Sequence, residues 1–452
     1  MGIDDDRSGD RRPQHWGCAP AAPAALRPLS GNVGNVDGAP EPDVVVIVLR
    51  YNGDPAQLGR CVESVVSDAS DSDLHVNILL VDNASTVVPH AVQECAALHA
   101  NTVSTLILAR NHGFAGGVNQ GIAHSRGEFV FLLNDDATVE PGTLRSSVDT
   151  LRGAPSDVVA VATKMLLASD PFILDGVGIA VNGRGEAFNR GLGQPDIGQY
   201  DQSEECLGPC FGAALVRRTA FAPDMVGPLD ESYFLYYEDV EWSWRATVMG
   251  WRTITAPQAV VRHDMSSSSR ADSYAFKHRF IERNLLASVA RCFEFRRAVA
   301  IWARRWPALV KGRITGEFPK ASGGAAFDAV RRLPSTLIAR RRIQRRRRRS
   351  DDHVIAFSLD EHTFFDPVRY LPQRSMKALA VAAQRHVDKR TDESVDDRQR
   401  WRALAIAARG AHSADAQRVV RELAVSLDER LGPYVDAAVG TGLNRGTTNR
   451  TG

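Results

Sequence analysis

Residues 44–49 of the chain read VVVIVL, six apolar side chains in a row. A run without polar alternation is typical of a strand buried on both faces, as strands in parallel sheets are. Residues 55–68 follow with apolar side chains at three- and four-residue spacing, which predicts a helix with one buried face. Together, the two segments predict the first strand and helix of an α/β domain.

The same alternation of strand and helix continues along the next part of the chain. The expected strands cover residues 76–81, 104–108 and 128–133, and the expected helices cover residues 89–99 and 118–125. Elements of these lengths in this order predict a doubly wound sheet, in which ligands bind at the carboxyl ends of the strands. Past residue 141 the order loosens, and the Gly-rich residues 176–193 suggest hairpins or loops that could build an acceptor site.

The flanking segments differ in composition from the α/β domain, which we expect at residues 44–270. Residues 1–43 are rich in Pro, Gly, Ala, Asp and Arg and lack a sustained period, which predicts a disordered leader. Residues 271–350 combine helical spacing with many arginines and predict a basic amphipathic helical segment. Residues 351–452 contain further helical stretches and are expected to form a small helical C-terminal domain.

The composition of the chain indicates its class of protein and its cellular compartment. The chain of 452 residues has a net charge of +1, with 44% hydrophobic and 24% charged residues, as expected of a folded protein with a sizeable core. Its six cysteines are scattered, which indicates free thiols in a reducing compartment. We find no signal-peptide pattern and no apolar run of about 18 residues, so we expect a cytoplasmic protein that does not span a membrane.

Polar side chains follow three of the expected strands. Tyr51 and Asn52 come after the first strand, Asp82 comes after the second, and Asp135 and Asp136 come after the fourth. A carboxylate at a strand end can hydrogen-bond a ribose or a base, and two near a diphosphate can hold a divalent cation. Asp and Asn also cap helices and shape turns, so each motif alone leaves that interpretation open.

A Gly-rich segment, RNHGFAGGVNQG at residues 110–121, lies between the third and fourth expected strands. Its paired glycines, Gly116 and Gly117, precede an expected helix, where backbone N–H groups can approach phosphate oxygens. The spacing fits neither a Walker loop nor a dinucleotide-binding G-x-G-x-x-G turn. An ordinary turn from loop to helix is the alternative.

Acidic side chains lie among aromatic ones in YYEDVEW, residues 236–242. Aromatic side chains can exclude water and hold a sugar face, while Glu238 or Asp239 could accept a proton from a hydroxyl. The alternative is an acidic helix start that complements the helix dipole. Further along, His263 ends an expected strand at residues 259–262 and could supply a neutral imidazole to a metal, although a lone histidine is more often structural.

In their order and spacing, these motifs between residues 44 and 290 resemble the family 2 glycosyltransferases. The resemblance is closest to the rhamnosyltransferase-like and galactofuranosyltransferase-like branch. That family has the GT-A fold and inverts the anomeric centre of the transferred sugar. The resemblance therefore implies an α/β fold of the GT-A type, with a doubly wound mixed sheet and, in this chain, a C-terminal helical extension.

The resemblance also implies a role for each site residue. Donor contacts would come from Tyr51, Asn52 and Asp82 at the nucleoside, from Asn111, Gly116, Gly117 and Asn119 along the diphosphate and sugar, and from Asp135 close to the ribose. Asp136 would bind Mg²⁺ or Mn²⁺, and His263 would be a second protein ligand of the metal. Asp239 would be the general base for the acceptor hydroxyl, and Glu238 would help to bind the acceptor.

Two positions depart from the pattern of the family. Asn134 stands where the DXD-like element usually begins with Asp, which removes one charged ligand for a metal. Arg50 stands where a small hydroxyl residue is more common, so contacts near the base of the donor are expected to differ.

Arginines crowd residues 340–349, RRRIQRRRRR. Together with the basic amphipathic helix before them, they favour peripheral attachment to an anionic membrane surface, at the inner face of the cell membrane. A flexible solvated linker is the alternative interpretation. Nucleic-acid binding is the least supported, because the cluster has no interleaved aromatic side chains and no reading motif.

Three functions follow from these observations. The first is transfer of rhamnose or galactofuranose from a TDP- or UDP-linked donor to a glycan or lipid-linked acceptor, an activity of cell wall biogenesis. The second is nucleotidyl transfer to a sugar phosphate. That function requires a Gly-rich basic loop directly after the first strand, and residues 50–54 match such a loop poorly. The third is a non-enzymatic scaffold that binds membrane or nucleic acid, which predicts no joint role for Asp136, Asp239 and His263.

Overall fold

The computed structural model describes residues 41–264, 274–315, 318–358, 365–366, 371–372 and 374–446. The expected disordered leader lies outside the described residues except for residues 41–43, and it stays a prediction. The first strand begins at Val44, as the sequence predicts.

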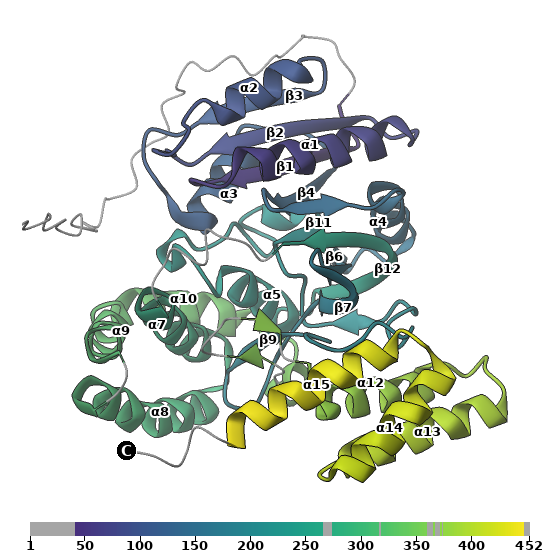
Figure 1. Cartoon of the computed structure of the whole chain (residues 1–452). Coiled ribbons are helices and arrows are strands. Elements are labelled where there is room, and N and C mark those ends of the chain that lie inside the picture. The colour runs from purple at the N-terminus through teal and green to yellow at the C-terminus, as the bar shows by residue number, and fades with distance from the viewer. Residues whose placement is uncertain are drawn as a thin grey trace, which may run out of the picture. The chain divides into compact units, whose positions relative to one another are not determined.

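A mixed sheet of ten strands forms the centre of the α/β domain (Figure 1). Its parallel half has the order β3, β2, β1, β4, and the bounds of these strands are Val44–Arg50 for β1, Val76–Asp82 for β2, Val103–Ile107 for β3 and Phe129–Asn134 for β4. The other half contains β5 (Ala137–Val139), β6 (Val158–Leu167), β7 (Asp170–Val177), β10 (Glu205–Cys206), β11 (Ala213–Arg217) and β12 (Arg252–His263). The strand β11 runs antiparallel between β4 and β6, while β12 runs parallel to β6.

Helices cover both faces of this sheet. Along β1, the side chains of Val44, Val46 and Val48 enter one apolar core, and those of Val45 and Ile47 enter another. The first core includes side chains of α1 (Pro55–Ser70), α2 (Ala91–Leu98) and α4 (Thr143–Gly153), and the second includes side chains of α3 (Gly113–Ala123) and α5 (Glu238–Val248). The expectation of a doubly wound mixed α/β sheet is therefore confirmed.

The helix α3 begins earlier than expected, at Gly113 instead of Val118. The paired glycines consequently lie inside the helix and not in a turn before it. A Cβ at Gly117 would sit 2.6 Å from Cδ1 of Leu49, and a Cβ at Gly121 would sit 2.8 Å from Cγ2 of Ile47. These glycines let α3 pack directly on β1, a tertiary requirement that the turn interpretation missed.

Short elements complete the α/β domain. They are β8 (Ile179–Val181), β9 (Ala187–Asn189) and the 3-10 turns η1 (Arg218–Phe221) and η2 (Glu231–Tyr233). Because β8 pairs with β9 in an antiparallel hairpin, the hairpins expected within residues 176–193 are confirmed there.

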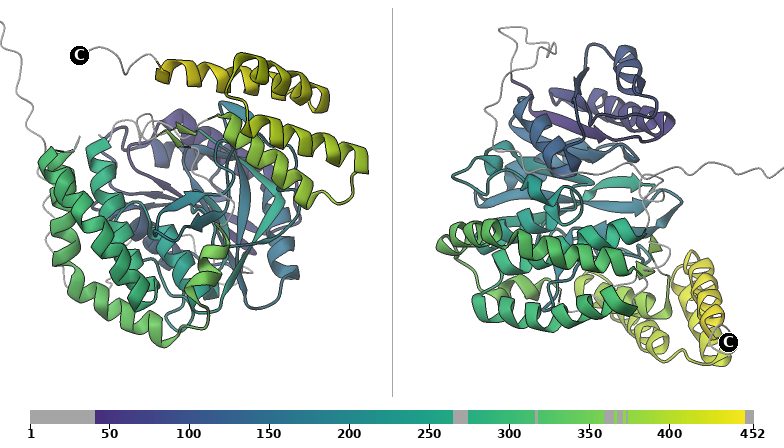
Figure 2. Two further views of the ribbon diagram at one scale, coloured as in Figure 1. Left: turned by 90° about the horizontal axis from the view of Figure 1, so that it is seen from below. Right: turned by 90° about the vertical axis from the view of Figure 1, so that its left-hand side faces the viewer.

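A helical extension follows the α/β domain, as expected (Figure 2). Its first part holds α7 (Tyr274–Cys292), α8 (Phe295–Thr315), α9 (Pro319–Arg331), α10 (Leu333–Arg345) and α11 (Asp351–Ala356). After the short pair β13 (Phe365–Asp366) and β14 (Leu371–Pro372) come α12 (Met376–Lys389), α13 (Val395–Arg409), α14 (Ala414–Leu427) and α15 (Leu431–Gly446). The helix α13 ends at the cap Gly410, and Ser413 caps the start of α14.

The helices α12 to α15 pack against the sheet domain. Their apolar core also contains Leu167, Ile173 and Ile197, which belong to the β6–β7 region. A half-buried carboxylate, Glu204, binds cations from both sides of this contact, namely Arg190, Arg385 and Lys389. Burial by itself raises the pKa of Glu204, but these cations outweigh it and lower the pKa to about 2.

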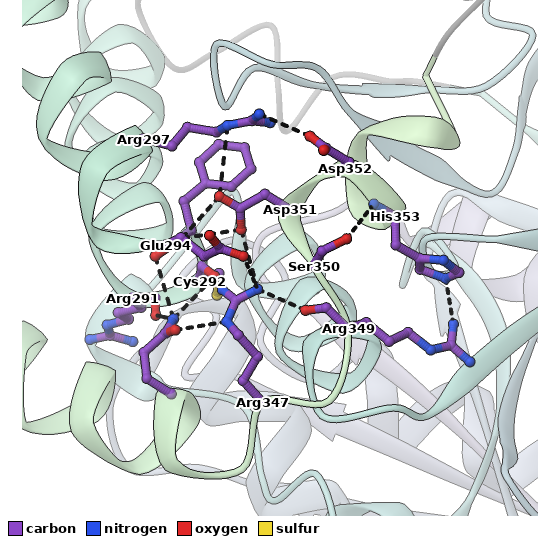
Figure 3. Close-up of polar contacts among 12 residues, drawn as sticks. Arg291, Cys292, Glu294, Arg297, Arg347, Arg349, Ser350, Asp351, Asp352 and His353 are labelled. Carbon is purple, nitrogen blue, oxygen red and sulfur yellow. Dashed lines mark hydrogen bonds and ion pairs between the residues drawn. The ribbon is translucent and has the colours of Figure 1, made fainter.

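The arginine cluster at residues 340–349 is structured, so the linker interpretation is wrong. Arg340 donates to the carbonyl oxygens of Ala290 (2.7 Å) and Phe293 (2.6 Å) at the end of α7. In the same region, Arg347 donates to the carbonyl oxygen of Cys292 and forms an ion pair with Asp351 at 3.2 Å (Figure 3). Several of these arginines therefore satisfy helix carbonyl groups inside the molecule.

The sequence predicts that the chain has no membrane-spanning helix and that its cysteines are free thiols. Among the described residues, no helix combines the length and the apolar character that crossing a bilayer requires. The cysteines in the described part of the chain, Cys61, Cys95, Cys206, Cys210 and Cys292, are all free, as expected.

Candidate active site

The carboxyl ends of three parallel strands meet at one edge of the sheet. Arg50 pairs with Asp82 across β1 and β2, and Leu49 pairs with Asn134 across β1 and β4. This register places the polar residues after β1, β2 and β4 next to one another. It is the edge at which the sequence predicts the donor and the metal to bind.

Asp82 and Asn52 join the loops that follow β1 and β2. Asp82 accepts hydrogen bonds from Nη1 of Arg50 (3.2 Å) and from the backbone N–H of Ser85 (2.6 Å). Oδ1 of Asn52 accepts from the backbone N–H groups of Thr86 (2.7 Å) and Val87 (2.9 Å). Both predicted donor contacts therefore also fix the loop at residues 83–87. Tyr51, which directly precedes Asn52, is half-buried and makes no side-chain hydrogen bond with another described residue.

Asn111 holds the start of α3. Its Oδ1 accepts from Nδ2 of Asn83 (3.0 Å) and from the backbone N–H of Gly113 (2.7 Å). The next N–H, that of Phe114, donates to the carbonyl oxygen of Phe234 at 2.6 Å. Two N–H groups at the start of this helix are thus already bonded within the protein, which removes part of the support for a phosphate site there.

Asn119 faces the loop before η2. Its Nδ2 donates to the carbonyl oxygen of Leu229 (2.9 Å), and its Oδ1 accepts from the N–H of the same residue (3.1 Å). Gly116 lies under His112, whose Cβ is 2.7 Å from the position of an added Cβ. Gly116 and Asn119 therefore have structural roles in addition to the donor contacts predicted for them.

Asp135 is enclosed at the end of β4. A Cβ added at Gly53 would lie 2.1 Å from its Oδ2, so a larger residue at position 53 would displace this carboxylate. Burial, helped by the charge of Asp136, raises the pKa of Asp135 to about 7, although Arg50 acts in the opposite direction.

Asp136 and His263, the two predicted metal ligands, lie side by side. Nε2 of His263 is 3.2 Å from Oδ1 of Asp136. The two residues meet because His263, at the end of β12, pairs with Ala137, the first residue of β5, which directly follows Asp136. The other ring nitrogen, Nδ1, is 2.8 Å from Oδ2 of the buried Asp175 on β7. Burial lowers the pKa of His263, but hydrogen bonds with Asp136 and Asp175 outweigh it and raise the pKa to about 10.

Asp136 and His263 can act as two protein ligands of a divalent cation if the cation displaces the proton between Nε2 of His263 and Asp136, because only a neutral imidazole binds a metal. A carboxylate behind a ligating histidine fixes the ring and its tautomer, and Asp175 stands in that position behind His263. Within the described residues, no group of three or more His, Cys, Asp or Glu side chains could hold a metal. A cation at Asp136 and His263 would therefore complete its coordination with diphosphate oxygens and water, as Mg²⁺ commonly does.

Glu238 and Asp239 begin α5, where Glu238 is buried and Asp239 is half-buried. Burial raises the pKa of both carboxyl groups, and the neighbouring charge of Asp239 raises that of Glu238 further. Hydrogen bonds from the backbone of Val240 and Phe211 partly offset the shift of Asp239. One oxygen of Glu238 has no hydrogen-bond partner among the described residues, which leaves a buried acceptor atom available to a ligand.

The loop before this acidic pair is held in an unusual conformation. Phe234, Tyr236 and Tyr237 have φ angles of 65°, 65° and 71°, in the left-handed region that non-glycine residues rarely adopt. Nδ2 of Asn284 on α7 donates to the carbonyl oxygens of residues 233, 235 and 236, at 3.0, 3.0 and 2.6 Å. Such strain persists only where the surroundings impose it, which is common at functional sites.

Residues 210–212 stand between the acidic pair and the metal pair. Asp239 is hydrogen-bonded to the backbone of Phe211 and to the side chain of Cys210, and burial raises the pKa of that thiol. A Cβ at Gly212 would sit 3.2 Å from Nδ2 of Asn134, which is itself 3.4 Å from Nε2 of His263. The structure thus brings residues 136, 263, 238 and 239 into one region.

The other predicted residues lie farther along the same edge. Asp82 connects to this region through Arg50, whose charge acts on Asp135. Asn111 and Asn119 connect to it through α3 and the loop that contains Phe234.

Three residues of the site were missed or left without a role by the sequence analysis. Asp175 sits in FILDGV, where the signal was a single carboxylate inside an apolar strand. Arg50 was noted only as a departure from a family pattern, yet it is buried and bonds Asp82 and the carbonyl oxygens of residues 53 and 87. Asn284 carried no signal at all, because its role depends on the packing of α7 against the acidic loop.

The sheet domain is similar to known proteins. Residues 45–221 match the model of glycosyl transferase family 2. An N-acetylglucosaminyl-diphospho-decaprenol L-rhamnosyltransferase of Mycobacterium tuberculosis is 28% identical over 252 residues, which cover 50% of this chain and 78% of that protein. The succinoglycan biosynthesis protein ExoO of Rhizobium meliloti is 30% identical over 117 residues, or 26% of this chain and 32% of that protein. A crystal structure of GalNAc-T7 with UDP, GalNAc and Mn²⁺ shares 14% identity over 65% of this chain and 58% of that one, with a TM-score of 0.47.

Proposed function

We propose that this chain is a glycosyltransferase of family 2, which moves a sugar from a nucleotide diphosphate donor to an acceptor hydroxyl by single displacement. The observation that carries the proposal is the juxtaposition of Asp136 and His263 with Glu238 and Asp239 around residues 210–212. A pair of residues that holds a cation and a carboxylate that accepts a proton are the two groups that this reaction needs, and we assign these roles to Asp136 with His263 and to Asp239. A nucleotidyltransferase or an inert scaffold would leave this combination without a use.

The leaving group is expected to bind at the edge that holds Asp136. Asp136 and His263 would hold Mg²⁺ or Mn²⁺, which supplies positive charge to the departing nucleotide diphosphate. Asp175 keeps the His263 ring oriented, so that Nε2 faces Asp136. The nucleoside would be positioned by residues in the loops that follow β1 and β2, namely Tyr51, Asn52 and Asp82.

The acceptor is expected to bind near the start of α5. Asp239 takes the proton from the acceptor hydroxyl while the oxygen attacks the anomeric carbon from the face opposite the leaving group, which inverts the centre. Glu238, with its unpartnered oxygen, binds a second hydroxyl of the acceptor. A raised pKa strengthens a carboxylate as a base, provided that the pH keeps it ionised.

The nature of the sugar and acceptor is proposed from the relatives. The rhamnosyltransferase of Mycobacterium tuberculosis carries L-rhamnose and a diphospho-decaprenol acceptor in its name. We therefore favour TDP-rhamnose as the donor, with a UDP-linked galactofuranose as second choice, and a lipid-linked glycan as the acceptor. Such an acceptor would place the enzyme at the inner face of the cell membrane, in a pathway of cell wall biogenesis.

A panel of nucleotide sugars tests this proposal. Thermal unfolding of the full chain is followed with TDP-rhamnose, UDP-galactofuranose and GDP-mannose, each with and without Mn²⁺. We expect the largest rise in Tm with TDP-rhamnose and Mn²⁺ together, because a ligand that binds only the native state stabilises it. No rise with any nucleotide sugar in the presence of Mn²⁺ would contradict the proposed function.

A further inference from the structure

An apolar groove lies between α8 and α10, and neither the acidic pair nor the metal pair is part of its lining. Its volume is about 460 Å³. Its lining on α8 includes Phe295, Val299, Trp302 and Trp306, and its lining on α10 includes Leu337. The indole rings of the two tryptophans are stacked, with centroids 6.2 Å apart.

The groove follows an apolar stripe along α8. The residues at positions 295, 298, 299, 302, 303, 306 and 307 recur at the spacing of one helix face. An amphipathic helix normally buries such a face, but here Phe295 is 69% exposed and Val299 is 49% exposed. On the facing helix, Leu337 is 47% exposed and Ile338 is 57% exposed. Contiguous exposed apolar side chains of this kind indicate a binding surface.

Positive charge surrounds this groove. Between Phe295 and Arg349 the sequence has 17 Lys or Arg and only two Asp or Glu, and α8 itself has no acidic residue. On α10, Arg341, Arg342 and Arg345 are exposed one and two turns after Ile338. These three make no hydrogen bond or ion pair with another described residue, unlike Arg340 and Arg347, so their charge is available to a partner.

We infer that the α8–α10 surface, made of Phe295, Val299, Leu337, Ile338, Arg341, Arg342, Arg345 and the groove between the helices, docks on an anionic lipid bilayer. The apolar side chains enter the boundary between headgroups and acyl chains, and the arginines bind lipid phosphates. Trp306 suits this boundary because a tryptophan ring is apolar and its N–H is polar, whereas the N–H of Trp302 donates to the carbonyl oxygen of Leu286 at 3.0 Å. A second copy of the chain fits poorly, because two surfaces with this excess of arginine repel each other.

The docking surface and the acidic pair share one supporting helix. Ala290 of α7 lines the groove, while Asn284 of the same helix bonds the loop before Asp239. Docking through α8 and α10 therefore holds the acceptor side of the site at a fixed offset from the bilayer. This inference rests on the proposed function in one respect: membrane docking brings the enzyme to its acceptor only if that acceptor is lipid-linked.

Cosedimentation with vesicles tests the docking surface directly. Wild-type protein is expected to pellet with vesicles that contain phosphatidylglycerol and to stay in solution with phosphatidylcholine vesicles. The triple variant Arg341→Gln, Arg342→Gln, Arg345→Gln is expected to bind about 10²-fold more weakly, since each basic side chain at an anionic surface strengthens binding about fivefold. The double variant Phe295→Ser, Leu337→Ser is expected to weaken binding at least about tenfold.

Matched controls carry the same changes elsewhere on the surface. Arg60, Arg402 and Arg409 are exposed on α1 and α13, and their replacement by Gln is expected to leave vesicle binding unchanged. Leu98 and Val395 are 80% and 70% exposed, and their replacement by Ser serves as the apolar control. Equal loss in test and control variants would overturn the inference, as would absence of wild-type pelleting or a dimer in solution that the Phe295→Ser, Leu337→Ser change dissociates.

A transfer assay separates this inference from the proposed function. With a water-soluble acceptor, the surface variants are expected to keep the wild-type rate. Vesicle binding without any transferase activity would sustain the docking surface and reject the proposed reaction, whereas full activity without vesicle binding would do the reverse.

Discussion

Replacing Asp239 by Asn is expected to lower kcat for sugar transfer by about 10²- to 10⁴-fold, the usual contribution of a general base. The amide keeps the shape of the side chain but cannot accept the proton of the acceptor hydroxyl. Binding of the nucleotide with Mn²⁺ is expected to stay near the wild-type value, because Asp136 and His263 are unchanged. Initial-rate kinetics together with nucleotide titration measure the two effects separately.

The pH profile supplies an independent reading of the same residue. Because burial raises the pKa of Asp239, the wild-type rate is expected to fall as the pH drops through that raised pKa and the base becomes protonated. The groups that act on Asp239 are Glu238 in its own helix, and Cys210 and the Phe211 backbone in the neighbouring segment. As a matched variant, Glu238→Gln is expected to raise KM for the acceptor more than it lowers kcat. A wild-type rate in Asp239→Asn would show that another group is the base.

Replacing His263 by Ala is expected to remove metal-dependent transfer, because it deletes one of two proposed protein ligands of the cation. Replacing Asp175 by Asn is expected to weaken Mn²⁺ binding by about 10- to 100-fold, which is typical when the partner of a ligating histidine is lost. Asp175 touches the ring and not the proposed cation, so its effect acts through the orientation of His263. Calorimetric titration of Mn²⁺ in the presence of the nucleotide diphosphate measures both changes.

Another aspartate of the same strand provides the control. Asp170 also belongs to β7, but it pairs with Arg374 at 2.6 Å and lies at the far end of the strand. Its replacement by Asn is expected to leave Mn²⁺ affinity unchanged. If Asp175→Asn bound Mn²⁺ as tightly as Asp170→Asn, the positioning role of Asp175 would be lost.

The strands were predictable from sequence because their signals are local. The run at residues 44–49 and the later apolar runs fall within one or two residues of β1 to β4, since burial on both faces requires continuous apolar side chains. The start of α3 was not predictable in this way. Glycine is a poor helix former, and only the close approach of Gly117 to Leu49 explains why it lies inside a helix.

The site was predictable in its residue types but not in its full set of contacts. That Asp136 and His263 lie together depends on the pairing of β5 with β12, which joins segments more than a hundred residues apart. The role of Asp175 could not be predicted, because a single carboxylate in an apolar strand does not indicate which residue it contacts. Likewise, a run of arginines looks the same in sequence whether it caps a helix, as Arg340 does, or faces outward, as Arg341 does.

The location of the metal tests the central claim most directly. Crystals grown with Mn²⁺ and the nucleotide diphosphate can be measured at the manganese absorption edge, where anomalous scattering marks the ion. We predict one manganese peak between the carboxylate of Asp136 and Nε2 of His263, in contact with the diphosphate and with Asp239 facing the same cleft. A peak bound by other residues, or Asp239 turned away from the nucleotide, would contradict the account.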